Sequence, residues 1–381
     1  MGLFKKNHSV EPATTPGSGN WQVGDYYNAN GKEGVVIWVD ETGRFIKILH
    51  LEEAELPWCT RAMTEVATDA VDQHDGSKNL EAISKIQDWK YMFPAFAWCA
   101  SRGEGWYLPA SEELYGFIGK DSKEILEIVN STLKKKGGKK IGGFIGGSYL
   151  SSTESEDRAK LLYSGSNVSD ADKNYGHKVR AVAMIDTELS VCVEPAPAPA
   201  PVDALVDAEC PTIWKVGDYY NVNGKEGVVF WVDQTGKHGK IVSVDQSKLE
   251  WCLYDGYDDK TRRKSTDEDN GMKNLQEVMK LKDWQINYCA HAWCADHGAG
   301  WYLPAVNELK ELMQEDNMNK VNATLAQMNR ELVAGRIAEA DKYWSSTCGS
   351  KEKRFAWFVF AGGAYQFVMS VDFYVRAVAA F

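Results

Sequence analysis

The stretch that decides the fold occurs twice: residues 97–110 read AWCASRGEGWYLPA, and residues 292–305 read AWCADHGAGWYLPA. The repetition extends in both directions from this stretch. Residues 21–43 and 214–236 are identical at 19 of 23 positions, and YLSST at 149 and VRAV at 179 return as YWSST at 343 and VRAV at 375. The repeated unit is about 165 residues long. Repeats of stacked arrays span only ~20–50 residues, so this is a duplicated domain that is large enough to have its own core.

Length and charge restrict the possible functions. The chain has 381 residues, with 43 Lys and Arg against 54 Asp and Glu, and a net charge of −11. An acidic protein of this kind is a poor binder of nucleic acid, because such binding depends on neutralising phosphates with Lys and Arg. No apolar run approaches the ~20 residues that a membrane helix needs, so no membrane insertion is expected.

The domain organisation follows from the repeat. We predict a polar N-terminal tail over residues 1–20, a first domain over 21–185, a Pro/Ala-rich linker over 186–213 and a second domain over 214–381. Alternating Pro and Ala in EPAPAPAP favours an extended spacer. The tail has no apolar stretch after Lys5 and Lys6, so no secretory signal is expected. Eight Cys are too few for a disulfide scaffold.

Each copy combines helical and strand patterns, so the predicted fold class is α+β. GVVIWVD and GVVFWVD, with the residues that follow them, predict hairpins. SKNLEAISKIQDW (77–89) and MKNLQEVMKLKDW (272–284) predict a first helix. A second helix is expected after WYLP, with Ser111 and Asn307 as N-caps.

Two further patterns belong to the second copy. A third helix is predicted from apolar residues at helical spacing, namely Val321, Leu325, Met328 and Leu332. After Tyr343 the pattern changes to strands. Residues 357–360 read WFVF, and if Trp357 and Val359 face the core, Phe358 and Phe360 face outward.

Four ordered motifs occur in the chain: GWYLP-x3-EL, YWSST, AW and a final VRAV-x-x-F. Together they resemble the Lcl C-terminal domain family, which has a C-type lectin-like fold. Because both copies carry the pattern, the resemblance implies two tandem C-type lectin-like domains joined by the Pro-Ala linker.

The second copy also resembles the variable proteins of diversity-generating retroelements. In those systems, error-prone reverse transcription replaces template adenines and rewrites a C-terminal segment, which here corresponds to residues 348–374. The resemblance implies a diversified ligand-binding surface made of Cys348, Gly349, Ser350, Phe358, Phe360, Tyr365, Gln366, Phe367, Met369, Ser370, Asp372 and Phe373. The first copy departs from this pattern, with Leu150 in place of the Trp of YWSST, and is interpreted as a fixed copy.

The expected function is therefore non-enzymatic. The chain is predicted to bind a protein or glycan on a target cell, and the resemblance implies a homo-oligomer such as a trimer. Without a secretion signal, we expect a phage tail location, or the cytoplasm before assembly, and favour the cell surface less. Two alternatives stay open: a fixed adhesin or structural module without diversification and, less favoured, an enzyme of the formylglycine-generating type.

No metal or other cofactor is expected. Cys289, His291, Cys294 and His297 have a spacing that suggests zinc, but only Cys294 has a counterpart in the first copy, Cys99. Calcium-dependent sugar binding in this fold uses a Glu-Pro-Asn-like triplet, and the two Glu-Pro pairs of the chain lie in the predicted tail, at 11–12, and in the predicted linker, at 194–195. No group of nucleophile, base and orienting residue is apparent, so no catalytic residues are predicted.

Overall fold

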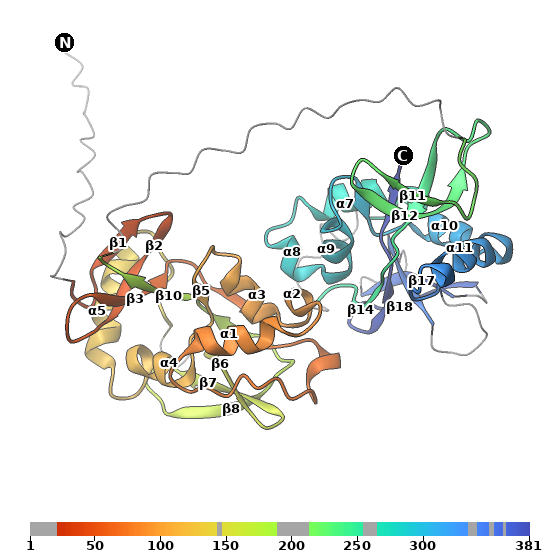
Figure 1. The fold of residues 1–381 in the computed structure, drawn as a ribbon. Coiled ribbons are helices and arrows are strands. Elements are labelled where there is room, and N and C mark those ends of the chain that lie inside the picture. Colours follow the sequence, from red (N-terminus) through yellow and green to blue (C-terminus); the bar gives the residue numbers. More distant parts are fainter. Residues whose placement is uncertain are drawn as a thin grey trace, which may run out of the picture. The chain divides into compact units, whose positions relative to one another are not determined.

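A computed structural model describes residues 21–142, 147–188, 213–253, 265–333, 341–349, 354–360 and 363–381 (Figure 1). These residues fall into two compact units. The first runs to Glu188 and the second from Ile213, except that Thr60–Met63 and Gln87–Pro94 are grouped with the second unit. Each unit contains both helices and largely antiparallel sheets, so the predicted α+β class is confirmed. The predicted tail and most of the predicted linker lie outside the described residues.

The first unit is built from two five-stranded sheets. One sheet has the order β1 (Tyr26–Ala29), β2 (Lys32–Val39), β3 (Phe45–His50), β10 (Val182–Asp186) and β5 (Trp106–Tyr107). The other has the order β4 (Ala54–Leu56), β9 (His177–Val179), β6 (Ser148–Ser155), β7 (Arg158–Tyr163) and β8 (Val168–Asp172). The helices of this part of the chain are η1 (Arg61–Met63), α1 (Gly76–Ser84), α2 (Trp89–Met92), α3 (Pro94–Ala100), α4 (Ser111–Ile118) and α5 (Lys123–Lys135).

The second unit repeats this topology. Its first sheet has the order β11 (Tyr219–Val222), β12 (Lys225–Val232), β13 (Gly239–Val242), β20 (Val378–Ala380) and β15 (Trp301–Tyr302). Its second sheet has the order β14 (Ser247–Glu250), β19 (Asp372–Val375), β16 (Tyr343–Cys348), β17 (Phe355–Phe360) and β18 (Gly363–Val368). The helices are α7 (Gly271–Val278), α8 (Trp284–Asn287), α9 (Cys289–Ala295), α10 (Val306–Leu312) and α11 (Glu315–Gln327).

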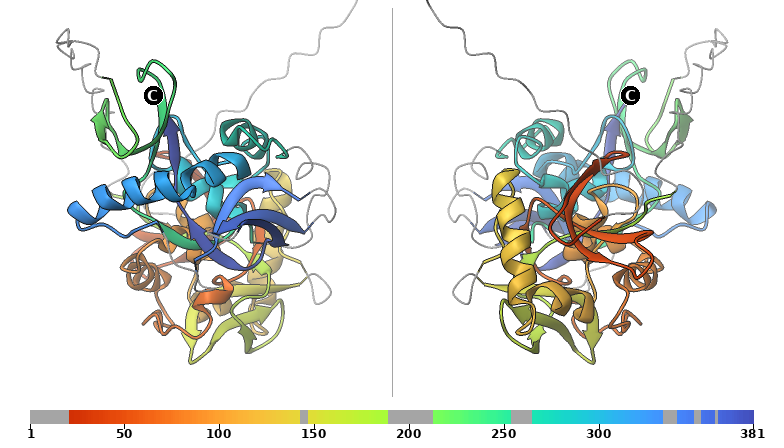
Figure 2. Two further views of the ribbon diagram at one scale, coloured as in Figure 1. Left: turned by 90° about the vertical axis from the view of Figure 1, so that its right-hand side faces the viewer. Right: turned by 90° about the vertical axis from the view of Figure 1, so that its left-hand side faces the viewer.

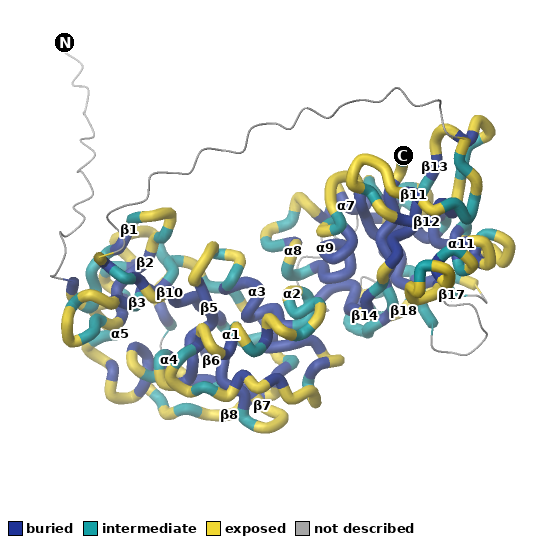
Figure 3. Tube along the Cα trace, viewed as in Figure 1, coloured by how far each residue is buried: buried dark blue, intermediate teal, exposed yellow. Residues whose placement is uncertain are grey.

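Each core lies between sheets and helices. In the first unit, residues of β2, α4, α5 and β6 form one buried cluster, which includes Val35, Leu114, Leu133 and Tyr149. In both units the long helix packs on the second strand of the first sheet, α5 on β2 and α11 on β12 (Figure 2). The strands β6 and β16 are buried along nearly their whole length (Figure 3).

The repeated GWYLP-x3-EL motif places a buried carboxylate at the start of a helix. Glu308 accepts hydrogen bonds from the backbone N–H of Ala305 at 2.8 Å and of Gly271 at 2.9 Å. It also accepts the Tyr302 hydroxyl at 2.8 Å and pairs with the Lys240 ammonium at 2.7 Å. Glu113 has the equivalent partners in the first unit. The Glu of the motif therefore joins a helix start to the neighbouring strands.

This arrangement corrects the predicted N-caps. The helices α4 and α10 begin at Ser111 and Val306, with Ala110 and Ala305 as N-caps. An Ala side chain cannot cap a helix, and the Glu three residues later instead accepts the N-cap backbone N–H, as in half of a capping box. Ser111 and Asn307 thus lie inside the first helical turn.

Other boundaries also differ from the predictions. Each predicted first helix is interrupted before its end, because Asp88 and Asp283 adopt left-handed backbone conformations with φ of 57° and 52°. The helix α11 ends at Gln327, since Asn329 is left-handed with φ of 55°, and Leu332 is exposed. The predicted linker start at 186 falls on the last residue of β10, where Asp186 pairs with Arg44 at 2.7 Å.

In the described ranges, no helix combines the length and the apolar character that are needed to cross a membrane.

Candidate functional site

The candidate site is a cluster of aromatic side chains on the second sheet of the second unit. We call it the aromatic surface and define it as Phe358 and Phe360 of β17, Tyr365 and Phe367 of β18, and Phe373 of β19. All five were predicted site residues, although they come from three strands and span 16 positions of the sequence. The structure brings them together on one face of the sheet.

Strand register explains why these residues meet. Phe358 lies opposite Tyr365 on β18 and opposite Trp344 on β16. Side chains that are directly opposite point to the same face, and those of adjacent residues point to opposite faces. Val359 therefore points to the other face, where it is buried in the core. Phe358 and Phe360 thus alternate with Val359, as predicted, but Trp357, which was expected to face the core with Val359, is only half-buried.

The rings of the aromatic surface contact one another at distances that are usual for aromatic pairs. The Phe358 and Phe373 centroids are 4.9 Å apart, those of Phe360 and Tyr365 are 5.5 Å apart, and those of Phe367 and Phe373 are 5.8 Å apart. Trp344 lies beneath, 4.5 Å from Phe373. These five and Trp344 form one continuous layer.

The layer has a buried base and an open edge. Phe358 and Phe373 are 6% and 8% exposed, because their neighbours in the cluster cover them. Phe358 therefore faces away from the core, as predicted, but it is not itself exposed. Tyr365 and Phe367 are 54% and 43% exposed, and Phe360 is half-buried. A partner would thus touch mainly residues 360, 365 and 367.

A cation lies against the base of the layer. The Lys342 ammonium is 5.7 Å from the Phe358 ring centroid and 5.4 Å from that of Phe373. Both distances are within the ~6 Å over which a cation is attracted to the face of a ring. Neither Lys342 nor Trp344 was among the predicted site residues. The sequence contains a signal for Trp344, because the two copies differ at this position and the first copy has Leu150 there.

The first unit provides an internal comparison. Its second sheet has the same strand order and register, with Tyr149 opposite Leu162 where the second unit has Tyr343 opposite Val359. The positions of the aromatic surface are occupied there by Leu161, Tyr163, Ser169, Ala171 and His177. At these five positions the first unit thus has one Tyr and one His, whereas the second unit has five Phe or Tyr rings. A sheet of the same order and register thus forms in the first unit without the five rings.

Three predicted site residues lie away from the aromatic surface. Cys348 and Met369 are buried, at 6% and 1% exposure. Met369 is held by backbone hydrogen bonds to Arg354 and Trp251, and neither its side chain nor that of Cys348 belongs to the exposed surface. Gln366 lies opposite Trp357, so it points to the other face of the sheet.

The remaining predicted residues lie at the margins. Gly349 is tightly enclosed, since a Cβ atom there would meet the Gln366 side chain and, at 3.0 Å, the Phe355 carbonyl oxygen. Ser370 and Asp372 are half-buried, in a turn and at the start of β19. Burial raises the pKa of Asp372 to about 6, against the lowering effect of the Lys248 ammonium. Ser350 lies outside the described residues.

Three of the four Cys and His residues with zinc-like spacing are packed in the core, and the fourth, His297, is half-buried with its Nε2 3.0 Å from an Asp245 carboxylate oxygen. Cys289, His291 and Cys294 are all buried. Burial holds the pKa of both thiols well above the ordinary value and lowers the pKa of His291 to about 3. Across the part of the chain that the structure describes, no three His, Cys, Asp or Glu side chains are arranged to hold a metal ion.

Comparison with known proteins identifies little. No family model matches the chain, and no curated protein does. A crystal structure of a fimbrial protein from Bacteroides ovatus is similar at 19% sequence identity and a TM-score of 0.32. The match covers 43% of this chain and 48% of the fimbrial protein, so it spans about half of that protein's length.

Proposed function

We propose that the second unit is a C-type lectin-like display domain that binds a protein or glycan on a target cell through its aromatic surface. The observation that carries this proposal is the internal comparison. Two copies of one sheet share order and register, and only the second has the five aromatic side chains. Of these rings, Tyr365 and Phe367 extend into solvent, and exposed aromatic rings that lie together are typical of a binding surface.

The physical chemistry of the surface favours binding of a macromolecule. Tyr365 and Phe367 are exposed at the edge of the layer, and the rings beneath keep them in place. Aromatic anchors dominate binding free energy, and the loss of a central one costs about 2 kcal/mol or more. The Tyr365 hydroxyl and the Lys342 ammonium add polar groups beside the apolar area. The proposed activity is binding, without a chemical step.

We further propose that this surface is diversified by a retroelement and is carried as an oligomer on a phage tail. Codons that arise from adenine substitution of AAC include those for Phe and Tyr, the residues of the aromatic surface. A multimer would increase affinity through avidity. The first unit, which lacks the aromatic layer, would then act as a fixed copy that provides attachment or reach.

Binding of the labelled full-length chain to a panel of bacterial cells tests the proposal. The double variant Tyr365→Ser, Phe367→Ser should bind the recognised cells at least ~30-fold more weakly. Tyr163→Ser is the control in the first unit, because Tyr163 is an exposed ring on the equivalent sheet, at the position that corresponds to Phe360. Equal loss in both variants, or no loss in the double variant, would count against the aromatic surface.

A further inference from the structure

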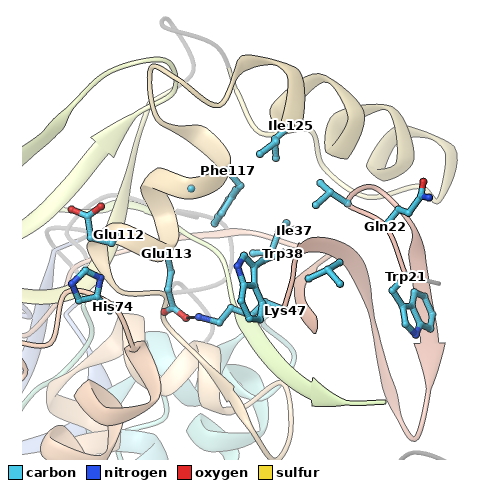
Figure 4. Close-up of a pocket in the computed structure, with 13 residues that line it drawn as sticks. Trp21, Gln22, Ile37, Trp38, Lys47, His74, Glu112, Glu113, Phe117 and Ile125 are labelled. Atoms are coloured by element: carbon cyan, nitrogen blue, oxygen red, sulfur yellow. Dashed lines mark hydrogen bonds and ion pairs between the residues drawn. The ribbon is translucent and has the colours of Figure 1, made fainter. Parts of the chain in front are cut away.

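The first unit contains a pocket of its own, which is a different feature from the aromatic surface of the second unit. It is a pocket of about 580 Å3 between β2 and β3 on one side and α4 and α5 on the other (Figure 4). We propose that this pocket binds a small amphipathic ligand that has an aromatic or apolar body and one ammonium group. Its volume is within the range of ~300–1,000 Å3 that is usual for small-molecule sites.

The wall of the pocket is mainly apolar. Ile37, Phe117 and Ile125 line it from β2, α4 and α5 (Figure 4). Trp38 also lines it and is 43% exposed, although most Trp side chains of the described chain are buried. The Lys47 ammonium lies 5.4 Å from the Trp38 ring centroid, within the distance at which a cation is attracted to the face of a ring. A large aromatic ring that is exposed at a pocket, as that of Trp38 is, can pack against the apolar body of a ligand.

Gly116 is a second, independent indication. It lies inside α4 and lines the pocket, and a Cβ atom there would have no other atom within 4 Å. Glycine in a helix interior is destabilising by about 1 kcal/mol relative to Ala, so it is usually explained by close packing or by function. No close packing occurs at Gly116. Its effect is to leave the pocket open.

Charge determines which end group fits. Lys47 is paired with Glu113, whose other carboxylate oxygen accepts two backbone N–H groups at 2.9 Å each. Glu112 also lines the pocket and is exposed beside His74 (Figure 4). One Lys against two Glu gives this end of the pocket a net negative charge. An ammonium group complements it, and a carboxylate does not.

The second unit differs at the same place. It retains the exposed ring and its cation, with Lys240 5.7 Å from the Trp231 centroid. However, the motif alignment places Glu311 at the position of Gly116 and Asn307 at that of Glu112. A long side chain therefore stands where the first unit has open space, while the number of carboxylates at this place is the same in the two units. The proposed ligand therefore binds the first unit, and Trp231→Ala is a matched control.

Three probes of similar size test the proposal on the full chain: 2-phenylethylamine, 2-phenylethanol and 3-phenylpropanoate. Isothermal titration and saturation-transfer NMR should show that the amine binds most tightly. Glu112→Gln should weaken amine binding by about fivefold, as expected for a partly solvated ion pair. Gly116→Leu should abolish binding by filling the pocket, whereas Gly116→Ala and Trp231→Ala should preserve it.

Several results would overturn the proposal. These are equal affinity for the three probes, binding that survives Gly116→Leu, and no binding of the amine. A further measurement on a chain that lacks residues 1–20 distinguishes an external ligand from the chain's own N-terminal segment. If the amine binds only to this shortened chain, the pocket is occupied by the chain's own N-terminal segment and not by an external ligand. Circular dichroism confirms in each case that the variant is folded.

Discussion

His291 stands edge-on to Trp251, with ring centroids 4.7 Å apart and ring planes at 89°, where Phe96 stands edge-on to Trp58 in the first unit. One copy thus has a hydrocarbon ring and the other an imidazole in the same kind of aromatic contact. Neither imidazole nitrogen has a hydrogen-bond partner within the described ranges. Burial lowers the pKa of His291 from 6.5 to about 3, so the ring is neutral in the folded protein.

The first prediction is that acid destabilises the second unit. Between pH 6.5 and about 3, the unfolded chain binds a proton at His291 and the folded chain does not. The free energy of unfolding is therefore highest above pH 6.5 and decreases as the pH falls. The expected decrease is about 2 kcal/mol between pH 7 and pH 5. His291→Phe should remove this part of the pH dependence. Urea unfolding at several pH values measures it, and parallel pH profiles for both proteins would refute the explanation.

The second prediction concerns the buried carboxylate of the second unit. Glu308→Gln removes the charge that pairs with Lys240 but keeps the shape of the side chain. Breaking a buried ion pair costs about 3–5 kcal/mol, and the partly exposed Lys240 places the expected loss at the lower end. Glu315→Gln, at an exposed position on α11, should change the free energy of unfolding by less than ~0.5 kcal/mol. Equal effects of the two substitutions would contradict the structural role of Glu308.

The third prediction contrasts two helical glycines of the first unit. A Cβ at Gly76 would collide with the Leu108 carbonyl oxygen, whereas one at Gly116 meets nothing within 4 Å. Gly76→Ala should therefore destabilise the unit by about 1–3 kcal/mol. Gly116→Ala should stabilise it by up to about 1 kcal/mol. Thermal unfolding of both variants gives the answer, and a destabilised Gly116→Ala would mean that the space beside α4 is filled.

The fourth prediction separates the base of the aromatic surface from its edge. Phe358 is buried, so Phe358→Ala should cost about 3–5 kcal/mol of stability. Phe367 is 43% exposed, and Phe367→Ala should cost less than ~1 kcal/mol while it weakens ligand binding. Urea unfolding distinguishes the two classes without knowledge of the ligand. Similar losses of stability would show that Phe367 is a core residue.

Much of the fold was predictable because its signals are local or repeated. The duplication, the α+β class and the facing of Phe358 opposite to Val359 follow from internal identity and from alternation. The helix breaks were missed because they depend on left-handed backbone at Asp88 and Asp283, which hydrophobic periodicity does not report. The N-caps were misplaced because the Glu113 side chain accepts the backbone N–H of Ala110 and so caps α4. In the sequence, a Ser at position 111 is a stronger sign of an N-cap than a Glu three residues after an Ala.

The candidate site was predictable in part. Strand alternation places Phe358, Tyr365 and Phe367 together once the hairpin register is known. It cannot report that Met369 turns into the core, since that burial depends on contacts with Trp251 and Cys252, more than a hundred residues earlier. The pocket beside Gly116 was not predicted for the same reason, because helix and sheet residues distant in sequence form it together.

Deep sequencing of the gene's 3′ end across a population tests the central claim most directly. If the exposed edge of the aromatic surface is a diversified binding surface, substitutions should be concentrated at codons 360, 365 and 367, at template adenines. Codons 343, 358 and 359, whose side chains are buried, should stay far more constant. Variation would then alternate along β18 with a period of two. A segment as uniform as the rest of the gene, or equal variation at codons 359 and 360, would contradict the claim.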